Sequence, residues 1–375
     1  MRLQNIRLIN YRNYELLELE TPGNVNLIVG PNAQGKTNLL ESIYVLALTK
    51  SHRTQKDKEL IQWDKKQALI AAQIEKKYGN VSLELRLAPQ GKTAKINGLE
   101  QRKLSDFIGA LNVVMFAPED LEIVKGSPGI RRRFLDMEIA QVIPSYLYHM
   151  QQYQKILLQR NNYLKEIQNS NQINEMMLEI WNQQLAEYGS KIMKSRENFI
   201  INLQKWALSI HESITKGKEQ LQIEYRPSFE ISDFSNESVL FDQFMIKLKQ
   251  VQQQEIRRGM TLYGPHRDDL GFYINGKDVQ MFGSQGQQRT VALSVKLAEI
   301  ELIRKETGEF PLLLLDDVLS ELDQNRQNQL IETFQNKVQT FITATGADNV
   351  SLSKFDHAGI FYVAEGNVTP KKLEE

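Results

Sequence analysis

Cysteine is missing from the 375-residue chain, and neither sign of charge is in excess. Without cysteine the chain has no disulfide, no thiolate metal site and no cysteine nucleophile, which suits a reducing cytoplasm. The 46 basic and 46 acidic residues give a formal net charge of zero. This balance neither favours nor excludes a nucleic-acid partner, because a single face can still be basic.

Long hydrophobic runs are missing as well. The N-terminal stretch MRLQNIRLINYRNY has no apolar segment of the length that a signal peptide needs. The longest apolar run, at 311–315, is far too short to span a membrane. We therefore expect a soluble, cytoplasmic protein without a membrane partner.

Three regions differ in their residue patterns. Residues 1–125 and 256–375 alternate short apolar strands with helices, which predicts one α/β domain built from both ends of the chain. Residues 126–255 are poor in proline, rich in Gln and Asn, and follow helical spacing. This middle region is therefore predicted to be an inserted helical arm.

The two ends contain clear local signals. Strands are expected at 25–30, 68–74, 81–87, 311–317, 339–345 and around 359–365, after a hairpin near the start, and helices at 36–50, 285–306 and 323–336. Asn97-Gly98 and Asn275-Gly276 are tight-turn signals between apolar stretches.

The arm carries two apolar stripes. One runs from Trp181 to Trp206 with a repeat close to 3.5 residues, and the other, from Met150 to Ile167, is broken by Arg160. The polar stretch 168–174 is the expected connection. A projecting helical hairpin or small bundle and ordinary amphipathic core helices explain the pattern about equally well.

GPNAQGKT, residues 30–37, matches the pattern G-x-x-x-x-G-K-[ST] in full, between a predicted strand and a predicted helix. Its glycines let backbone N–H groups approach phosphates, Lys36 supplies a positive charge, and the Thr37 hydroxyl is suited to Mg²⁺. The loop predicts a nucleotide site.

LLLLDD, residues 312–317, predicts a strand buried on both faces that ends in two carboxylates. Next to a phosphate loop, Asp316 can hold Mg²⁺, and Asp317 can orient or deprotonate the attacking water. We therefore expect Lys36, Asp316 and Asp317 to be the catalytic residues, with Thr37 and Asp316 as the Mg²⁺ ligands.

Residues 283–305 begin with GSQGQQ, in which Ser284 is an expected N-cap residue and Gly286 allows close approach. The N-terminus of the following helix offers free N–H groups to an anion. On its own, this stretch also fits an ordinary capped core helix.

Taken in this order, the three motifs resemble those of the ABC-type ATPases, in the branch that contains SMC and other DNA-repair ATPases. The resemblance implies a P-loop ATPase head with mixed sheets and an inserted α-helical arm. It also implies a homodimer closed by two ATP molecules, in which the signature residues of one copy contact the ATP bound to the other.

The resemblance also assigns individual residues. Residues 320–323 match the D-loop of the family. The implied signature residues are Ser284, Gln285, Gly286 and Gln287. The implied ATP contacts are Arg12, Asn13, Gly30, Pro31, Asn32, Ala33, Gln34, Gly35, Lys36, Thr37 and Asn38.

Two further stretches, 117–136 and 263–270, are similar to hallmark segments of one DNA-repair protein of this branch. That similarity implies a role in repair and replication restart. It implies binding of duplex and gapped DNA in the ATP state, and work with RecO and RecR to load the RecA recombinase on single strands.

Asp317 stands where the family has glutamate, and 341–345 contains no histidine. Both departures predict slow hydrolysis, with ATP acting mainly to hold the dimer together.

The basic cluster Lys125, Arg131, Arg132 and Arg133 can be interpreted in two ways. It can contact DNA phosphates, or it can pair with acidic side chains and brace the arm, which is the interpretation we favour. Two other functions remain possible, a soluble P-loop phosphotransferase and a transporter-type ATPase subunit. The signature-type helix and the D-loop argue against the phosphotransferase, and the heptad-like insertion and both hallmark segments argue against the transporter subunit.

Overall fold

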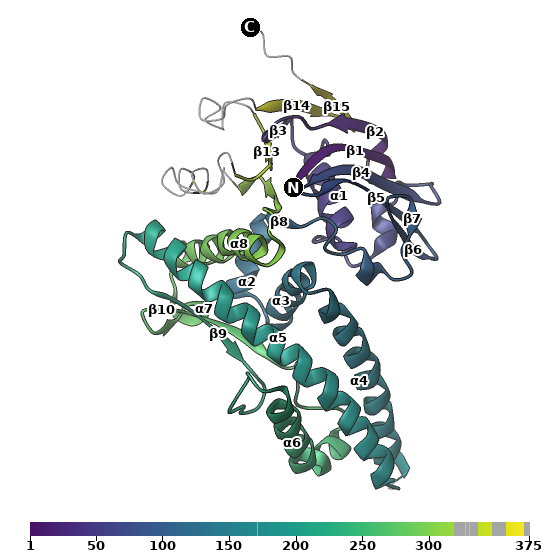
Figure 1. The fold of residues 1–375 in the computed structure, drawn as a ribbon, viewed down its shortest axis with the longest axis vertical. Coiled ribbons are helices and arrows are strands. Elements are labelled where there is room, and N and C mark those ends of the chain that lie inside the picture. Colours follow the sequence, from purple (N-terminus) through teal and green to yellow (C-terminus); the bar gives the residue numbers. More distant parts are fainter. Residues whose placement is uncertain (171, 319–326, 328–329, 331–336, 347–357, 371–375) are drawn as a thin grey trace. The chain divides into compact units, whose positions relative to one another are not determined.

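The computed structural model describes residues 1–170, 172–318, 327, 330, 337–346 and 358–370. Contacts divide the chain into two compact units (Figure 1). The first combines Met1–Asp120 with Leu293–Glu375, and the second is the continuous segment Leu121–Ala292. The second unit thus includes more than the arm predicted over 126–255.

A mixed six-stranded sheet forms the centre of the first unit, with the strand order β15-β14-β3-β13-β12-β8. Its strands are β3 (Val25–Val29), β8 (Val113–Phe116), β12 (Leu312–Asp316), β13 (Thr340–Ala344), β14 (Gly359–Ala364) and β15 (Asn367–Pro370). All pairs are parallel except that of β14 with β15. Every residue of β3, β12 and β13 is buried, as expected for parallel strands covered on both faces.

A second, antiparallel sheet of the same unit has the order β2-β1-β4-β5-β6-β7. Its strands are β1 (Arg2–Tyr11), β2 (Tyr14–Glu20), β4 (Ala68–Lys76), β5 (Gly79–Ala88), β6 (Gly91–Ile96) and β7 (Leu99–Glu100). The predicted N-terminal hairpin is confirmed by the pairing of β1 with β2.

Helix α1 (Lys36–Leu48) contacts both sheets, β4 and β5 on one and β8, β12 and β13 on the other. Its apolar side chains are buried almost all round, which is typical of a helix enclosed in a core. The helix predicted over 36–50 is therefore confirmed. Short 3-10 helices follow at η1 (Asp57–Leu60), η2 (Leu104–Asp106) and η3 (Pro118–Asp120).

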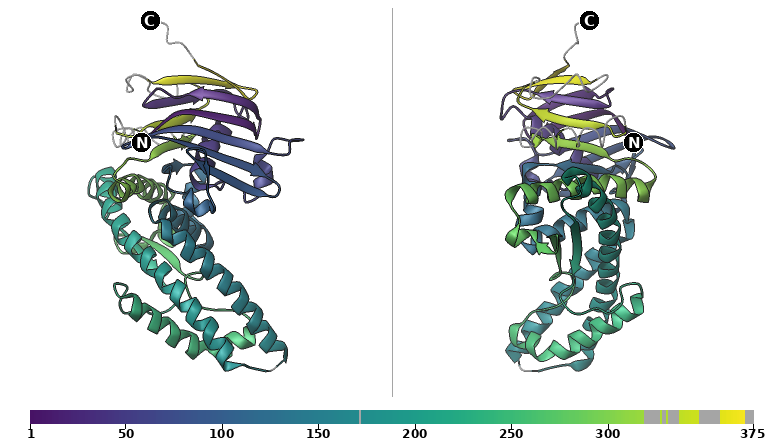
Figure 2. Two further views of the ribbon diagram at one scale, coloured as in Figure 1. Left: turned by 45° about the vertical axis from the view of Figure 1, so that its right-hand side comes forward. Right: turned by 90° about the vertical axis from the view of Figure 1, so that its left-hand side faces the viewer.

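The second unit is largely helical. It contains α2 (Leu121–Lys125), α3 (Pro128–Val142), α4 (Pro144–Ser170), α5 (Glu175–Thr215) and α6 (Glu237–Arg258). Helices α4 and α5 form the predicted hairpin, and α6 packs against both (Figure 2). The stripe of α5 is buried at Leu185, Ile192, Phe199 and Leu203, so the arm is a packed bundle of helices.

A small antiparallel sheet belongs to the same unit, with the order β11-β10-β9. It is formed by β9 (Leu221–Arg226), β10 (Asp269–Ile274) and β11 (Lys277–Asp278), and the short helix α7 (Val279–Phe282) follows. β9 packs on α5 and β10 packs on α3, which is why this segment joins the helical unit. Helix α8 (Gln285–Thr307) confirms the prediction over 285–306.

Both predicted Asn-Gly turns are confirmed. Asn97-Gly98 joins β6 to β7, and Asn275-Gly276 joins β10 to β11. In each pair both residues have positive φ, 51° and 77° in the first and 50° and 76° in the second. Asn and Gly tolerate this left-handed backbone, which two-residue hairpins require.

Candidate functional site

The phosphate loop connects β3 to α1 at the carboxyl end of the parallel sheet. Its two glycines are required by their surroundings. A Cβ on Gly30 would lie 2.2 Å from the Val363 carbonyl oxygen, and one on Gly35 would lie 2.5 Å from Asn13 Nδ2. Gly35 also has a φ of 119°, which side chains other than hydrogen rarely allow. The two glycines therefore let the loop lie in close contact with β14 and the β1–β2 turn.

Lys36 lies at the start of α1 and is 8% exposed. Its ammonium group donates to the carbonyl oxygens of Gly30, at 2.7 Å, and Pro31, at 2.8 Å. Because an ammonium group has three protons, one donor remains for an anion. Burial lowers the pKa of Lys36, and the negative charges of Asp317 and Asp316 offset part of this effect.

Asp316 ends β12 and connects the phosphate loop to the sheet. Its Oδ1 accepts hydrogen bonds from the Thr37 hydroxyl, at 3.0 Å, and from the Thr343 hydroxyl, at 2.8 Å. Burial raises the pKa of Asp316, while the two hydroxyl donors act in the opposite direction. The predicted Mg²⁺ pair Thr37 and Asp316 is thus within hydrogen-bonding distance, an arrangement that suits a hydrated cation.

Asp317 follows directly and lies exposed at the edge of the sheet. Its φ of 55° is left-handed, and its backbone N–H donates to the Thr343 hydroxyl at 2.9 Å. This geometry separates the two carboxylates. Asp316 is held among hydroxyl groups, while Asp317 is open to water and still close enough to raise the pKa of Lys36 against the effect of burial.

Arg12 and Asn13, in the turn after β1, have different partners. The Arg12 guanidinium binds the buried Glu41 carboxylate at 2.7 and 2.8 Å and donates to the Glu59 carbonyl oxygen at 2.9 Å. Asn13 contacts the phosphate loop directly, because its Nδ2 donates to the Gln34 carbonyl oxygen at 2.9 Å. Asn38 donates to Asn13 Oδ1 at 2.8 Å.

Two charged residues that the sequence analysis did not select also act on this site. Burial is the main influence on the pKa of Asp316, and among nearby charges Arg53 lowers it and Glu119 raises it. Arg53 also donates to Asn38 Oδ1 at 3.0 Å. Glu119 could have been found from the topology, because it follows β8, the parallel neighbour of β12, and parallel strands end at the same edge.

The predicted signature residues form a capped helix start in the second unit. The Gln287 N–H donates to Ser284 Oγ at 3.2 Å, and the Ser284 N–H donates to Gln287 Oε1 at 2.9 Å. This reciprocal pair is a capping box, so the prediction that Ser284 is an N-cap residue is confirmed. Gln285 and Gly286 lie in the first turn of α8, with their N–H groups at the end of the helix that attracts anions. The predicted D-loop 320–323 lies outside the described residues, and so does the helix predicted over 323–336 apart from residues 327 and 330.

The three DNA candidates differ in exposure. Arg131 is 2% exposed and binds the Asp269 carboxylate through two hydrogen bonds of 2.7 and 2.9 Å. Arg132 is half-buried and donates to the Asp268 carbonyl oxygen at 2.7 Å. Lys125 is partly exposed at the end of α2. Arg131 is therefore committed to an internal ion pair that joins the two hallmark segments.

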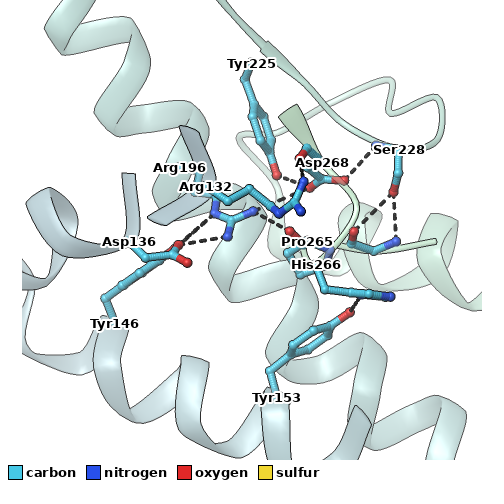
Figure 3. Close-up of polar contacts among 11 residues, drawn as sticks. Arg132, Asp136, Tyr146, Tyr153, Arg196, Tyr225, Ser228, Pro265, His266 and Asp268 are labelled. Carbon is cyan, nitrogen blue, oxygen red and sulfur yellow. Dashed lines mark hydrogen bonds and ion pairs between the residues drawn. The ribbon is translucent and has the colours of Figure 1, made fainter. Parts of the chain in front are cut away.

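The hallmark segments contribute to a buried polar network (Figure 3). Arg196 of α5 donates to Asp136 Oδ1 at 2.8 Å and to the Pro265 carbonyl oxygen at 2.6 Å. Asp268 accepts from the Tyr225 hydroxyl and from the Ser228 N–H. These bonds tie α3, α5 and the segment before β10 together within the second unit.

His266 belongs to the same network (Figure 3). Its Nδ1 lies 2.7 Å from the Tyr153 hydroxyl, and burial lowers its pKa to about 4. The ring is neutral at physiological pH and serves as a packed hydrogen-bonding group. Among the described residues, no set of three or more His, Asp or Glu side chains is arranged to hold a metal ion.

No helix within the described part of the chain has the length and apolar character needed to cross a bilayer.

Known proteins similar to this chain belong to one family. Residues 2–369 match the family model described as the RecF/RecN/SMC N terminal domain. The chain is 54% identical over 368 residues to proteins of Bacillus cereus (strain G9842) and Bacillus anthracis (strain A0248), each described as "DNA replication and repair protein RecF". The alignment covers 98% of this chain and 98% of each relative.

Solved structures agree. The recombination mediator protein RecF with ATP, in the RecFOR pathway, superposes with a TM-score of 0.91 at 35% identity, over 99% of this chain and 97% of that one. The Smc head domain of Pyrococcus furiosus superposes with a TM-score of 0.55 at 15% identity, over 99% of this chain and 96% of that one, which supports the ABC-type ATPase fold alone. The chain therefore belongs to the RecF family of DNA replication and repair proteins, within the wider RecF/RecN/SMC group.

Proposed function

We propose that this protein binds ATP and Mg²⁺ at the loop 30–37 and uses them to control a DNA-bound homodimer. One observation carries the proposal: Lys36, Thr37 and Asp316 converge at one edge of the parallel sheet, with Thr343 supporting the carboxylate. Backbone N–H groups, an ammonium and a hydroxyl–carboxylate pair are the groups that a nucleotide triphosphate with its cation requires. RecF relatives solved with ATP support the same interpretation.

The adenine end of the nucleotide has candidate neighbours in the turn after β1. Asn13 is bonded to the loop at Gln34, and Asn38 is bonded to Asn13. Both side chains belong to the ATP contacts that the sequence predicts. Arg12 precedes Asn13 in this turn, and its guanidinium is held by Glu41.

The proposed dimer rests on the signature residues, which lie in the second compact unit, whereas the phosphate loop lies in the first. In our proposal, Ser284 and Gly286 of one copy contact the γ-phosphate bound to the loop of the other. Two large apolar side chains next to Ser284 favour such a contact, since Met281 is 75% exposed and Phe282 is 71% exposed. Exposed apolar groups next to a polar site are typical of a surface that becomes buried.

We propose that hydrolysis is slow and serves as a release step. Asp317 is one methylene shorter than glutamate, and it lies exposed at the edge of the sheet. The segment 341–345 has no histidine to contact a γ-phosphate. A general base that reaches its water poorly lowers the rate of the chemical step. A turnover rate equal to that of transport ATPases would contradict this part of the proposal.

The biological role that we propose is recombinational repair and replication restart in the cytoplasm. The ATP-bound dimer binds duplex and gapped DNA and acts with RecO and RecR to load RecA on single strands. Relatives in the RecFOR pathway support this role. The partly exposed Lys125 and Arg132 remain candidate DNA contacts.

Sedimentation of the full chain tests the proposal. We expect a monomer without nucleotide, a dimer with ATP and Mg²⁺, and a heavier species when duplex DNA is added. Lys36→Arg should weaken the response to ATP. Ser284→Arg should still bind ATP yet stay monomeric, because its bulk blocks the partner's nucleotide. Dimerisation of Ser284→Arg with ATP would rule out the shared site.

A further inference from the structure

The side chain of Gln287, at the start of α8, has a partner at its amide oxygen and another at its amide nitrogen. Its Oε1 accepts from the Ser284 N–H at 2.9 Å, and its Nε2 donates to Glu219 Oε1 at 2.9 Å. An isolated capping box at a helix end leaves the amide nitrogen to water. Here a carboxylate from elsewhere in the unit holds it, so the orientation of Gln287 is fixed at both ends.

Glu219 is itself held in place. It lies between the end of α5 and the start of β9, with its side chain 22% exposed. Its second oxygen, Oε2, lies 3.1 Å from Nε2 of His211 on the last turns of α5, and the His211 side chain is fully buried. A carboxylate can only accept, so His211 Nε2 is the donor. Burial lowers the pKa of His211, which favours a neutral imidazole N–H in this bond.

The result is a continuous series of hydrogen bonds, His211 to Glu219, Glu219 to Gln287, and Gln287 to Ser284. Every member lies within Leu121–Ala292. Ser284 Oγ accepts the cap bond from the Gln287 N–H, and a hydroxyl that accepts still has its own proton to donate. The Ser284 hydroxyl is therefore oriented and remains able to bind an anion.

We propose that Glu219 is a positioning residue for the signature turn. It holds Gln287, and through Gln287 it holds Ser284, in the geometry with which this turn meets the phosphate of a second copy. His211 anchors Glu219 to α5, so the turn is fixed to the long helix of the arm. The inference rests on the proposed dimer, since it assigns a role at the site that the second copy completes.

The geometry allows Gln287 and Glu219 to exchange their side-chain types. Gln287→Glu keeps the capping box, because a glutamate side chain at this position accepts from Ser284 equally well, but it sets two carboxylates against each other. Adding Glu219→Gln restores the contact in the reverse direction. The amide nitrogen introduced at position 219 donates to the carboxylate introduced at position 287, and the amide oxygen at position 219 accepts from His211.

A matched control is available in the arm. Gln252 Nε2 donates to the Glu175 carboxylate at 3.1 Å, so Gln252→Glu also places a carboxylate against a glutamate, but at a distance from the signature turn along the chain. It carries the same change of charge in the same compact unit. A general effect of charge or folding would therefore affect both variants.

The experiment measures ATP-dependent self-association of the full chain by sedimentation, together with binding of ATP at low protein concentration. We expect Gln287→Glu to weaken self-association about tenfold, the effect of losing one hydrogen bond to a charged group. The exchanged pair should return it to within about twofold of the original chain. Gln252→Glu should leave it unchanged, and ATP binding should be the same in all variants.

Hydrogen exchange at the amides of Ser284–Gln288, without nucleotide, provides a second readout. Exchange should be faster in Gln287→Glu and normal in the exchanged pair. If the exchanged pair stays as weak as Gln287→Glu in both measurements, Glu219 does not position this turn. If the original chain fails to self-associate with ATP, the dimer proposal is wrong, and hydrogen exchange still decides whether Glu219 orders the turn.

Discussion

Thr343 donates a 2.8 Å hydrogen bond from its hydroxyl to Oδ1 of Asp316, its registered partner on the neighbouring parallel strand. The same hydroxyl accepts the Asp317 N–H at 2.9 Å. One side chain on β13 thus holds the Asp316 carboxylate and the backbone of Asp317, the two acidic residues expected at the end of β12. Thr343 lies 26 residues beyond Asp317 in the chain, so only the sheet brings them together.

Thr343→Val tests this support. Valine has a similar shape but no hydroxyl, so Asp316 loses a donor and its pKa, already raised by burial, rises further. We expect the Mg²⁺ concentration for half-maximal hydrolysis to increase about 10-fold or more, with a larger deficit at pH 6 than at pH 8. Thr340→Val, on the same strand, is the control, because its hydroxyl bonds to the Val338 carbonyl oxygen. Equal deficits in both variants would show that Thr343 has no special role.

Asp316→Asn should separate stability from function. Burial raises the pKa of Asp316 in the folded protein. The contribution of this carboxyl group to the free energy of unfolding is therefore present below its pKa in the unfolded chain, and it is lost as the pH rises through its pKa in the folded protein. Asparagine can still accept from Thr37 and Thr343 and carries no charge. Without nucleotide, we expect the Tm at pH 7 to rise by about 2–4 °C, with a smaller gain near pH 4, while hydrolysis is lost. Asp317→Asn, at an exposed position, should leave the Tm unchanged, and a fall in the Tm of Asp316→Asn would contradict the account.

Sequence patterns predicted the parts of this site that are local. The loop 30–37, its flanking strand and helix, and the strand 312–316 are each specified by neighbouring residues, through glycine spacing and a continuous apolar run. The capping box at Ser284 is local too, since its partners are three residues apart. Patterns of this length can be read without knowing the topology.

Partners far apart in the chain could not be predicted in this way. Arg12 was expected near the nucleotide, and nothing in the turn NYRNY indicates that its guanidinium binds Glu41, 29 residues away. In the sequence, Arg160 only interrupts an apolar stripe. Its partner Glu255 is 95 residues away, so no local pattern indicates the ion pair. Glu219 gave no signal, since a single acidic residue in a polar stretch is ordinary.

Arg12→Ala should mainly affect stability. Burial alone would raise the pKa of Glu41, but hydrogen bonds from Arg12 and Ser51 outweigh it, so the pKa is lowered from its ordinary value of 4.5. The stabilisation is therefore present at neutral pH and is lost in acid. We expect a loss of about 3–5 kcal/mol at pH 7, because a buried charge is left without its partner, and a smaller loss near pH 4.5. Urea unfolding at both pH values measures this, and a pH-independent loss would contradict it.

The Arg160 guanidinium is fully buried in the arm and bonds to Asn182, Thr261 and Glu255 at 2.9, 2.6 and 2.6 Å. These contacts connect α4, α5 and the end of α6 through one side chain. Glu255 in turn accepts from the Leu262 N–H at 2.8 Å. The group therefore fixes the alignment of the three helices, and its charges depend on one another.

Arg160→Met should cost about 3–5 kcal/mol, because Glu255 is left charged and unpaired. Adding Glu255→Gln should recover more than half of that loss, since the amide still accepts from Leu262 without a charge. Trp181 and Trp206 lie on α5, and Trp63 is 90% exposed, so urea unfolding followed by fluorescence in a Trp63→Phe background reports on the arm. Lys191→Met breaks the exposed pair with Glu187 and removes the ammonium group from the Tyr188 ring, and it should cost less than about 1 kcal/mol. A double variant as unstable as Arg160→Met would mean that the lost guanidinium contacts to Asn182 and Thr261, and not the unpaired charge, account for the cost.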